Sequence, residues 1–133
     1  MMENEYAPIP AEINVISQTI IDGAFKVHKA LGPGLLESVY EICLCHELQK
    51  SGLKVKRQVN VPVVYDNIKF DAGFRLDLLV GEKVIVEIKA VDDMIPVFDA
   101  QILTYLRLTN IRVGLLINFN SPVIKKGIKR LVL

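Results

Sequence analysis

The spacing of apolar residues predicts two helices at the start of the chain. The first pattern recurs every three or four positions and comprises Ile13, Ile16, Ile20, Ala24, Val27 and Leu31. It ends at the GPG segment of residues 32–34, and a second stripe follows with Leu36, Tyr40, Cys43, Leu44 and Leu48. Gly52 is typical of a residue that ends such a helix. Residues 1–11 precede the main pattern, and we expect them to form a flexible N-terminal arm.

From residue 55 the apolar positions alternate, which predicts β-strands. The alternation is carried by Val55, Val59, Val61 and Val63, and Pro62 within this run favours the edge of a sheet. Turn residues at 66–67 and 81–83 separate it from two further apolar runs, residues 68–80 and 84–90. The three runs together predict an antiparallel meander.

A third helix is predicted at residues 94–110, with Pro96 in its first turn. The next run, residues 112–120, is almost continuously apolar, as in a strand buried on both faces, and a short basic segment ends the chain. The order is therefore helix, helix, three strands, helix, strand and a possible last strand. This order indicates one α/β or α+β domain of residues 1–133.

The composition is that of an ordinary well-packed domain, with 51% hydrophobic and 23% charged residues. No apolar run is long enough to cross a bilayer and no signal peptide is visible, so we expect a cytoplasmic protein with no membrane partner. Cys43 and Cys45 are expected to be buried free thiols. The net charge of +1 gives no general attraction for nucleic acid, so binding would need a local basic patch. The candidates are residues 54–57 and 125–130, for which a solvated strand face is the alternative.

Four charged residues lie inside the apolar runs of the second and third strands: Arg75, Asp77, Glu87 and Lys89. The alternation places Arg75, Asp77 and Leu79 on one face of the second strand, and it places Glu87 and Lys89 together on the third strand. A hairpin would bring Asp77 near Glu87, and two carboxylates suit a hard cation such as Mg²⁺. Cross-strand salt bridges on a solvated face would explain the same charges. The spacing alone leaves both interpretations open.

Polar residues on two helices add to this group. Glu37 and Tyr40 share one side of the second helix, although Glu37 would also complement the helix dipole. Gln101 and Tyr105 lie four apart on the third helix, where an amphipathic boundary would also account for them.

Taken together, these residues resemble the motifs of the PD-(D/E)XK nuclease superfamily, especially its exonuclease-like branch. The matching elements are Asp77, then Glu87-Ile88-Lys89 after a hairpin, then Gln101-x-x-x-Tyr105. The segment LGPGLLESVYE, with Gly34, Glu37 and Tyr40, looks like the GxxExxY protein family, small members of that superfamily. Leu76 stands where the motif's name has a Pro. The resemblance implies a restriction-endonuclease-like α/β core, α-β-β-β-α-β, with a mixed central sheet flanked by helices and an extra N-terminal helix.

The resemblance also implies roles for individual residues. Asp77 and Glu87 would hold Mg²⁺ or Mn²⁺ together with the main-chain carbonyl of Ile88, and Glu37 would join them directly or through a metal-bound water. Lys89 would position or activate the attacking water. The residues expected to line the site or contact substrate are Gln101, Tyr105, Arg75, Tyr40 and His28. For Arg75, a phosphate contact and a carboxylate partner are both open.

The function that follows is a metal-dependent nuclease that hydrolyses phosphodiester bonds in nucleic acid, with DNA as the expected substrate. A homodimer would enlarge its small binding surface. The alternative is a non-catalytic module that keeps the nuclease fold and binds nucleic acid or protein.

Overall fold

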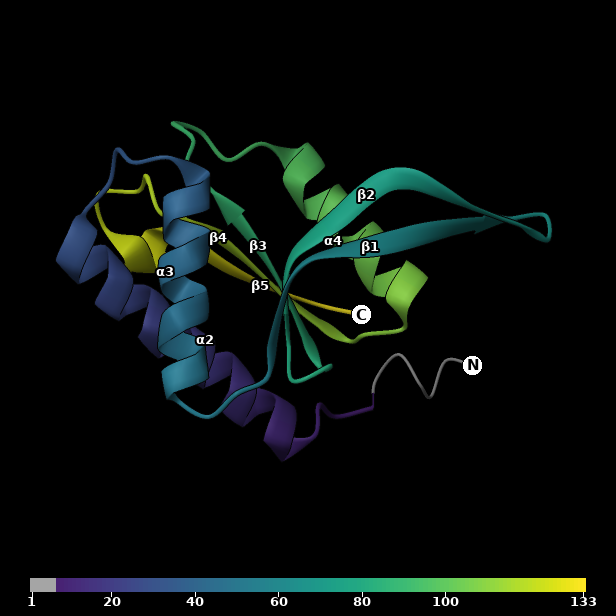
Figure 1. Ribbon diagram of the computed structural model, residues 1–133, viewed down its shortest axis with the longest axis horizontal. Coiled ribbons are helices and arrows are strands. Elements are labelled where there is room, and N and C mark those ends of the chain that lie inside the picture. The colour runs from purple at the N-terminus through teal and green to yellow at the C-terminus, as the bar shows by residue number, and fades with distance from the viewer. Residues whose placement is uncertain (1–6) are drawn as a thin grey trace.

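The computed structural model describes residues 7–133 and contains one five-stranded sheet with helices on both faces (Figure 1). Its elements are α2 (Ala11–Leu31), α3 (Glu37–Lys50), β1 (Val55–Tyr65), β2 (Ile68–Val80), β3 (Val84–Lys89), α4 (Pro96–Thr109), β4 (Val113–Asn118), the 3-10 turn η1 (Ile124–Gly127) and β5 (Ile128–Val132). These bounds confirm the predicted order of elements, including the possible last strand.

The sheet is mixed, with the strands in the order β1-β2-β3-β4-β5. The first three strands form the predicted antiparallel meander, and α4 then crosses over so that β4 pairs parallel to β3. β5 returns antiparallel to β4. β1 is an edge strand, as Pro62 predicted, and its pairing with β2 is irregular between Asn60 and Pro62. The expected mixed α/β sheet flanked by helices is therefore confirmed.

Alternation along β3 divides the core into two layers. Val84, Val86 and Ile88 pack in the layer beneath α2 and α3, whereas Ile85 packs in the layer beneath α4. Gly114 of β4 lets α4 approach closely, because a Cβ there would lie 2.8 Å from Cδ1 of Ile102. β3 is thus covered on both faces, and Glu87 on this strand is buried by the fold itself.

Two details of the predicted helical stripes are wrong. Leu36 precedes the first turn of α3 and is 74% exposed, whereas the polar Glu41 and the thiol of Cys45 are buried. Leu31, at the last turn of α2, is 40% exposed. In both cases the residue lies at a helix end, where the chain leaves the core before the apolar pattern stops.

The distal parts of β1 and β2 project from the body as a hairpin arm, residues 61–74 (Figure 1). Most of its apolar side chains lie in solvent, among them Val64, Tyr65, Ile68, Phe70 and Phe74. The arm therefore extends the sheet, and α4 contacts only its base, at Val61 and Phe74.

The N-terminal arm is only partly described, because residues 1–6 lie outside the described range. Arg112 donates hydrogen bonds to the carbonyl oxygens of Ala7 and Pro8, and the helix starts at Ala11. Within residues 7–133, no helix combines the length and the apolar character that a membrane-spanning segment requires.

Candidate active site

The carboxylates of Asp77 and Glu87 meet where β2 separates from β3. The pairing of the two strands covers only Leu78–Val80 against Val84–Val86. Beyond it, the backbone N–H of Asp77 donates to Oε2 of Glu87 at 2.8 Å, and the N–H of Ile88 donates to Oδ2 of Asp77 at 2.8 Å. Each carboxylate thus accepts a main-chain hydrogen bond from the opposite strand, and one oxygen of each is held in a fixed position.

An irregularity in β1 lies directly opposite this point. Gln58 has a φ of 53°, and the β1–β2 ladder skips Gln58 and Asp77. A non-glycine residue in this conformation costs about 1 kcal/mol or more, so the surrounding contacts must hold it. Leu76 and Leu79 both pack beneath α4, which regular alternation would not allow. The predicted shared face of Arg75, Asp77 and Leu79 is therefore wrong, because the strand changes phase at Asp77.

Burial raises the pKa values of both carboxyl groups, and neighbouring negative charges raise them further. Desolvation and the charge of Asp77 raise the pKa of Glu87 to about 8, and Glu87 is 5% exposed. Desolvation also raises the pKa of Asp77 to about 6, against the hydrogen bond from the Ile88 N–H. At neutral pH the pair therefore retains a proton in the absence of a cation. An additional positive charge bound at this site would favour the loss of that proton.

Lys89 supplies one positive charge beside the pair but no salt bridge. Its charge lowers the pKa of both Asp77 and Glu87, and its Nζ lies 4.4 Å from the ring centroid of Phe98. Within residues 7–133, no salt bridge links Lys89 or Arg75 to either carboxylate of the pair. The cross-strand ion pairs that would have explained these charges are thus not formed.

α4 brings Gln101 and Tyr105 to the same region. Both line one cleft together with Lys89, and Tyr105 is 4% exposed. Burial raises the pKa of Tyr105, and the charges of Glu87 and Asp77 raise it further. The structure therefore places Tyr105 next to the carboxylate pair.

Glu37 opens α3 and is exposed, and its charge raises the pKa of Asp77 and of Glu87. Residues 7–133 contain no group of three or more Asp, Glu, His or Cys side chains arranged to hold a metal ion. Of the two routes predicted for Glu37, direct ligation is therefore not supported, and the route through a bound water remains.

Sequence reasoning missed a second buried acid, Glu41. Its Oε2 accepts hydrogen bonds from Nη2 and Nε of Arg57 at 2.9 and 3.1 Å, and its Oε1 accepts one from Nε2 of Gln58 at 2.8 Å. The same Gln58 nitrogen lies 3.5 Å from Oδ1 of Asp77. The negative charge of Glu41 also raises the pKa of Asp77, and its effect is larger than the effect of the Glu37 charge. Glu41, Arg57 and Gln58, here called the support network, connect α3 and β1 to the carboxylate pair.

One sequence signal could have revealed this network. Glu41 follows Glu37 by four positions, so both project from one side of α3. Arg57 belongs to the basic segment of residues 54–57 and supplies the opposite charge. That segment is therefore partly committed to an internal ion pair rather than free to bind phosphate.

Three predicted contact residues make hydrogen bonds to other segments of the chain. The hydroxyl of the fully buried Tyr40 donates to the Gly32 carbonyl at 2.6 Å and accepts from the Leu35 N–H at 3.0 Å. Nε2 of His28 lies 2.8 Å from the carbonyl oxygen of Ser121, which accepts its hydrogen bond. We interpret both as residues that fix loops rather than touch substrate.

Arg75 is the third of these residues. Its Nη1 donates to Oδ1 of Asn60 at 2.6 Å and lies 4.0 Å from Oδ1 of Asp71. Of the two roles left open for it, a carboxylate partner agrees with this geometry, but the partner is on the hairpin arm and not at the site.

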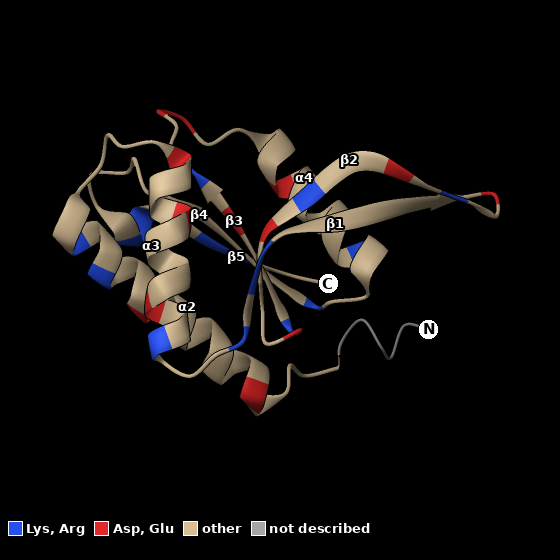
Figure 2. Cartoon of the chain, viewed as in Figure 1, with Lys and Arg blue, Asp and Glu red and all other residues tan. Residues whose placement is uncertain are grey.

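Charge is distributed without one dominant basic surface. Lys and Arg segments are spread over the elements, whereas acidic segments of α3, β2 and β3 lie near one another (Figure 2). In the C-terminal basic segment, Lys129 pairs with Asp99 and Arg130 bonds Asn14. The acidic residues of these three elements therefore lie around the candidate site, where Arg57 pairs with Glu41 and no salt bridge among residues 7–133 reaches Asp77 or Glu87.

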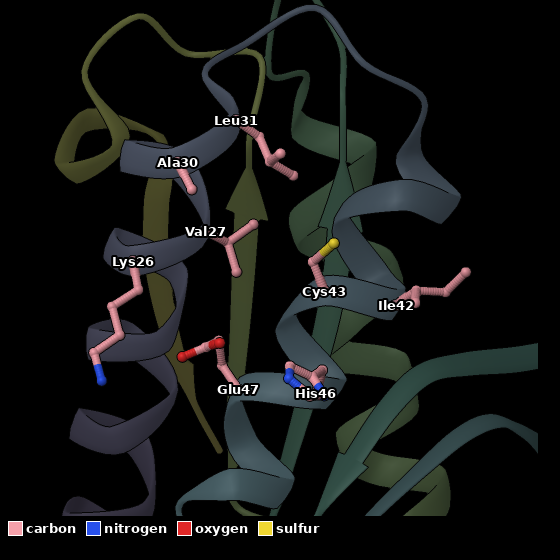
Figure 3. A pocket seen from close by; sticks show the side chains of 8 residues that line it. All are labelled: Lys26, Val27, Ala30, Leu31, Ile42, Cys43, His46 and Glu47. Atoms are coloured by element: carbon pink, nitrogen blue, oxygen red, sulfur yellow. The ribbon is translucent and has the colours of Figure 1, made fainter.

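A separate groove lies between α2 and α3 (Figure 3). Its volume is about 370 Å³, and apolar side chains such as Val27, Leu31 and Ile42 make most of its wall. Cys43 and His46 also face it, but it contains none of the predicted site residues. We therefore keep this groove apart from the candidate active site.

The donors present fit a hard divalent cation. Mg²⁺ and Mn²⁺ prefer oxygen ligands, and Mg²⁺ is commonly held by one or two carboxylates with waters completing its shell. Asp77 and Glu87 would supply the two carboxylates. Their pKa values are raised, and the positive charge of such an ion would favour the ionised form of both groups.

A mixed sheet flanked by helices, with a buried and a half-buried carboxylate and a lysine where two strands separate, defines the class of α/β proteins with a restriction-endonuclease-like core. A family model described as the PD-(D/E)XK nuclease superfamily matches residues 14–131, and the chain belongs to this superfamily. Nucleases of this superfamily generally use divalent metal ions. No curated protein and no solved structure matches the chain.

Proposed function

We propose that the protein is a Mg²⁺- or Mn²⁺-dependent nuclease of the GxxExxY type that hydrolyses phosphodiester bonds, with DNA as the expected substrate. The observation that carries the proposal is the reciprocal main-chain bonding of Asp77 and Glu87, with Lys89 beside them and in no salt bridge with any residue of 7–133. A surface ion pair would need neither the burial nor the fixed geometry.

The chemistry follows from these positions. A bound divalent ion would lower the pKa of a coordinated water and neutralise charge on the phosphoryl oxygens. Asp77 and Glu87 would hold that ion, and the ammonium of Lys89 would orient the water and stabilise charge that develops on the phosphate. Hydrolysis forms a bond from the water oxygen to phosphorus and breaks the bond from phosphorus to the leaving sugar oxygen, which takes up a proton.

The test is cleavage of single- and double-stranded DNA and RNA with Mg²⁺ or Mn²⁺. Asp77→Asn and Glu87→Gln should abolish cleavage while the chain stays folded, and Lys89→Ala should lower the rate by about 100-fold or more. Asp71→Asn is the matched control, because Asp71 lies on the same strand but is exposed on the hairpin arm. Folded Asp77→Asn and Glu87→Gln variants that cut as fast as the wild type would refute the proposal.

The alternative is a non-catalytic binding module with the same fold, which the net charge of +1 favours. Calorimetric titration with Mg²⁺ or Mn²⁺ separates the two, since a chain with no metal affinity at the pair could not run the reaction. The cytoplasmic location and the homodimer stay predictions, and sedimentation with and without DNA tests the second.

A further inference from the structure

A cleft of about 510 Å³ lies between the base of the hairpin arm and α4. Its lining includes Lys89, Gln101 and Tyr105, three residues of the candidate active site. Phe74, at the base of the arm, and Phe98, on α4, line the same cleft. A polymer whose phosphate contacts Lys89 therefore has this cleft beside it for a neighbouring residue.

The walls of this cleft are aromatic. Phe74 contacts Tyr105 edge-on, with ring centroids 6.2 Å apart, yet it remains 40% exposed. Phe98 carries the Lys89 ammonium over its ring and is half-buried. Part of the Phe74 ring is therefore left uncovered by the core. A flat apolar ring can stack on a base, and the ammonium of Lys89 can bind the phosphate, so together they suit one nucleotide.

Duplex binding needs something that this surface lacks. Affinity for a duplex depends mainly on several Lys or Arg contacts to phosphates. Among the described residues, Lys89 is the one cationic side chain that lines the cleft. Nearby, Arg57 is paired with Glu41 and Arg75 is bonded to Asn60. The bases of a duplex are also stacked on each other and cannot reach an aromatic wall.

From these observations we infer that the ligand of the site is single-stranded nucleic acid, with a base stacked on Phe74 and the adjoining phosphodiester at Lys89. This inference rests on the proposed function for its phosphodiester, and it adds the substrate class. Base stacking does not distinguish sequences, so binding should be tolerant of sequence.

The experiment measures binding apart from cleavage. Fluorescence anisotropy would follow a labelled oligothymidylate, an abasic strand of equal length and a duplex, each with the Glu87→Gln chain in EDTA. The abasic strand keeps the phosphates and removes the bases. We expect the oligothymidylate to bind at least about 10-fold more tightly than the other two, and a uridine oligomer distinguishes RNA from DNA.

Two variants locate the stacking. Phe74→Leu keeps an apolar side chain without the aromatic ring and should weaken oligothymidylate binding about 5- to 100-fold, whereas Phe74→Trp should preserve it. Phe70→Leu, at an equally exposed position farther along the arm, is the matched control and should change nothing. Circular dichroism confirms that each variant is folded.

Equal affinity for the abasic strand or the duplex, or no effect of Phe74→Leu, would overturn the inference, and so would a chain that binds no strand at all. The two proposals fail separately. A wild-type chain that binds single strands through Phe74 but never cuts them with Mn²⁺ refutes the nuclease alone. One that cuts duplex and single strands equally, with Phe74→Leu unaffected, refutes the inference alone.

Discussion

The proton retained by the Asp77–Glu87 pair makes the stability of the metal-free protein depend on pH, and Glu87→Gln tests this directly. The amide has the shape of the protonated carboxyl group and still accepts the hydrogen bond from the Asp77 N–H, but it cannot ionise. The variant therefore removes one charge from the site and changes little else.

The size of the effect follows from the pKa of Glu87, which rises from 4.5 to about 8 on folding. Because the folded chain holds the proton more tightly than the unfolded chain, this contribution to stability is complete below about pH 4.5. It is lost as the pH rises towards 8. Each pH unit across this window corresponds to about 1.4 kcal/mol, so the loss between pH 5.5 and 8.5 is about 3 kcal/mol. Asp77, with its pKa raised to about 6, loses its own part earlier in the window.

The assay is urea unfolding in EDTA at pH 5.5 and 8.5. We compare the free energy of unfolding of Glu87→Gln with that of the wild type at each pH. The difference should be about 3 kcal/mol larger, in favour of the variant, at pH 8.5 than at pH 5.5. Mn²⁺ should then stabilise the wild type at pH 8.5 and leave the variant unchanged. Glu82→Gln is the control, because Glu82 lies in an exposed turn with Lys56 as its partner, and its profile should follow the wild type. If the free energies of unfolding of the wild type and of Glu87→Gln change with pH in parallel, the conclusion that the Asp77–Glu87 pair retains a proton is refuted.

Two further variants test the surroundings of the site. Glu41→Gln should lower the free energy of unfolding in urea by about 2 kcal/mol and slow cleavage, since it breaks the buried pair with Arg57. The control is Glu47→Gln, whose partner Lys50 is exposed, and it should lower the free energy of unfolding by under about 1 kcal/mol. Equal effects of the two variants would contradict the importance of burial. Tyr40→Phe should cost about 1–2 kcal/mol and leave the KM for nucleic acid unchanged, because its hydroxyl bonds only the loop at Gly32 and Leu35 among the described residues. A raised KM at unchanged stability would restore the predicted substrate contact, and Tyr65→Phe, on the exposed arm, should alter neither quantity.

Much of the fold could be predicted from the sequence, because alternation and helical spacing record which faces are buried. The meander, the crossover helix and the two-sided burial of β3 all follow from the positions of apolar residues. The charges at Asp77, Glu87 and Lys89 stood out for the same reason, as exceptions to an apolar run.

The remainder depends on contacts between distant segments. Glu41 resembles any helical surface acid until Arg57 of β1 is placed against it, so only the fold distinguishes the two cases. Apolar and polar residues alternate along the hairpin arm as they do in a strand covered by a helix. The sequence therefore does not reveal that most of the arm is uncovered. Gln58 carries no local signal for a positive φ, which asparagine or glycine would have given.

The departure at position 76 shows how such contacts can replace a motif residue. A proline there would end the ladder by removing an N–H from the strand. Leu76 instead remains paired with Val59 and packs beneath α4, and the ladder breaks one residue later. At this gap in the β1–β2 ladder, Gln58 has its positive φ and donates a hydrogen bond to Glu41. On the β3 side the pairing ends at Leu78, and the carboxylates of Glu87 and Asp77 accept hydrogen bonds from the main-chain N–H groups of Asp77 and Ile88. Both ladders are therefore interrupted at Asp77 without a proline, with the support network on one side of the strand and Glu87 on the other.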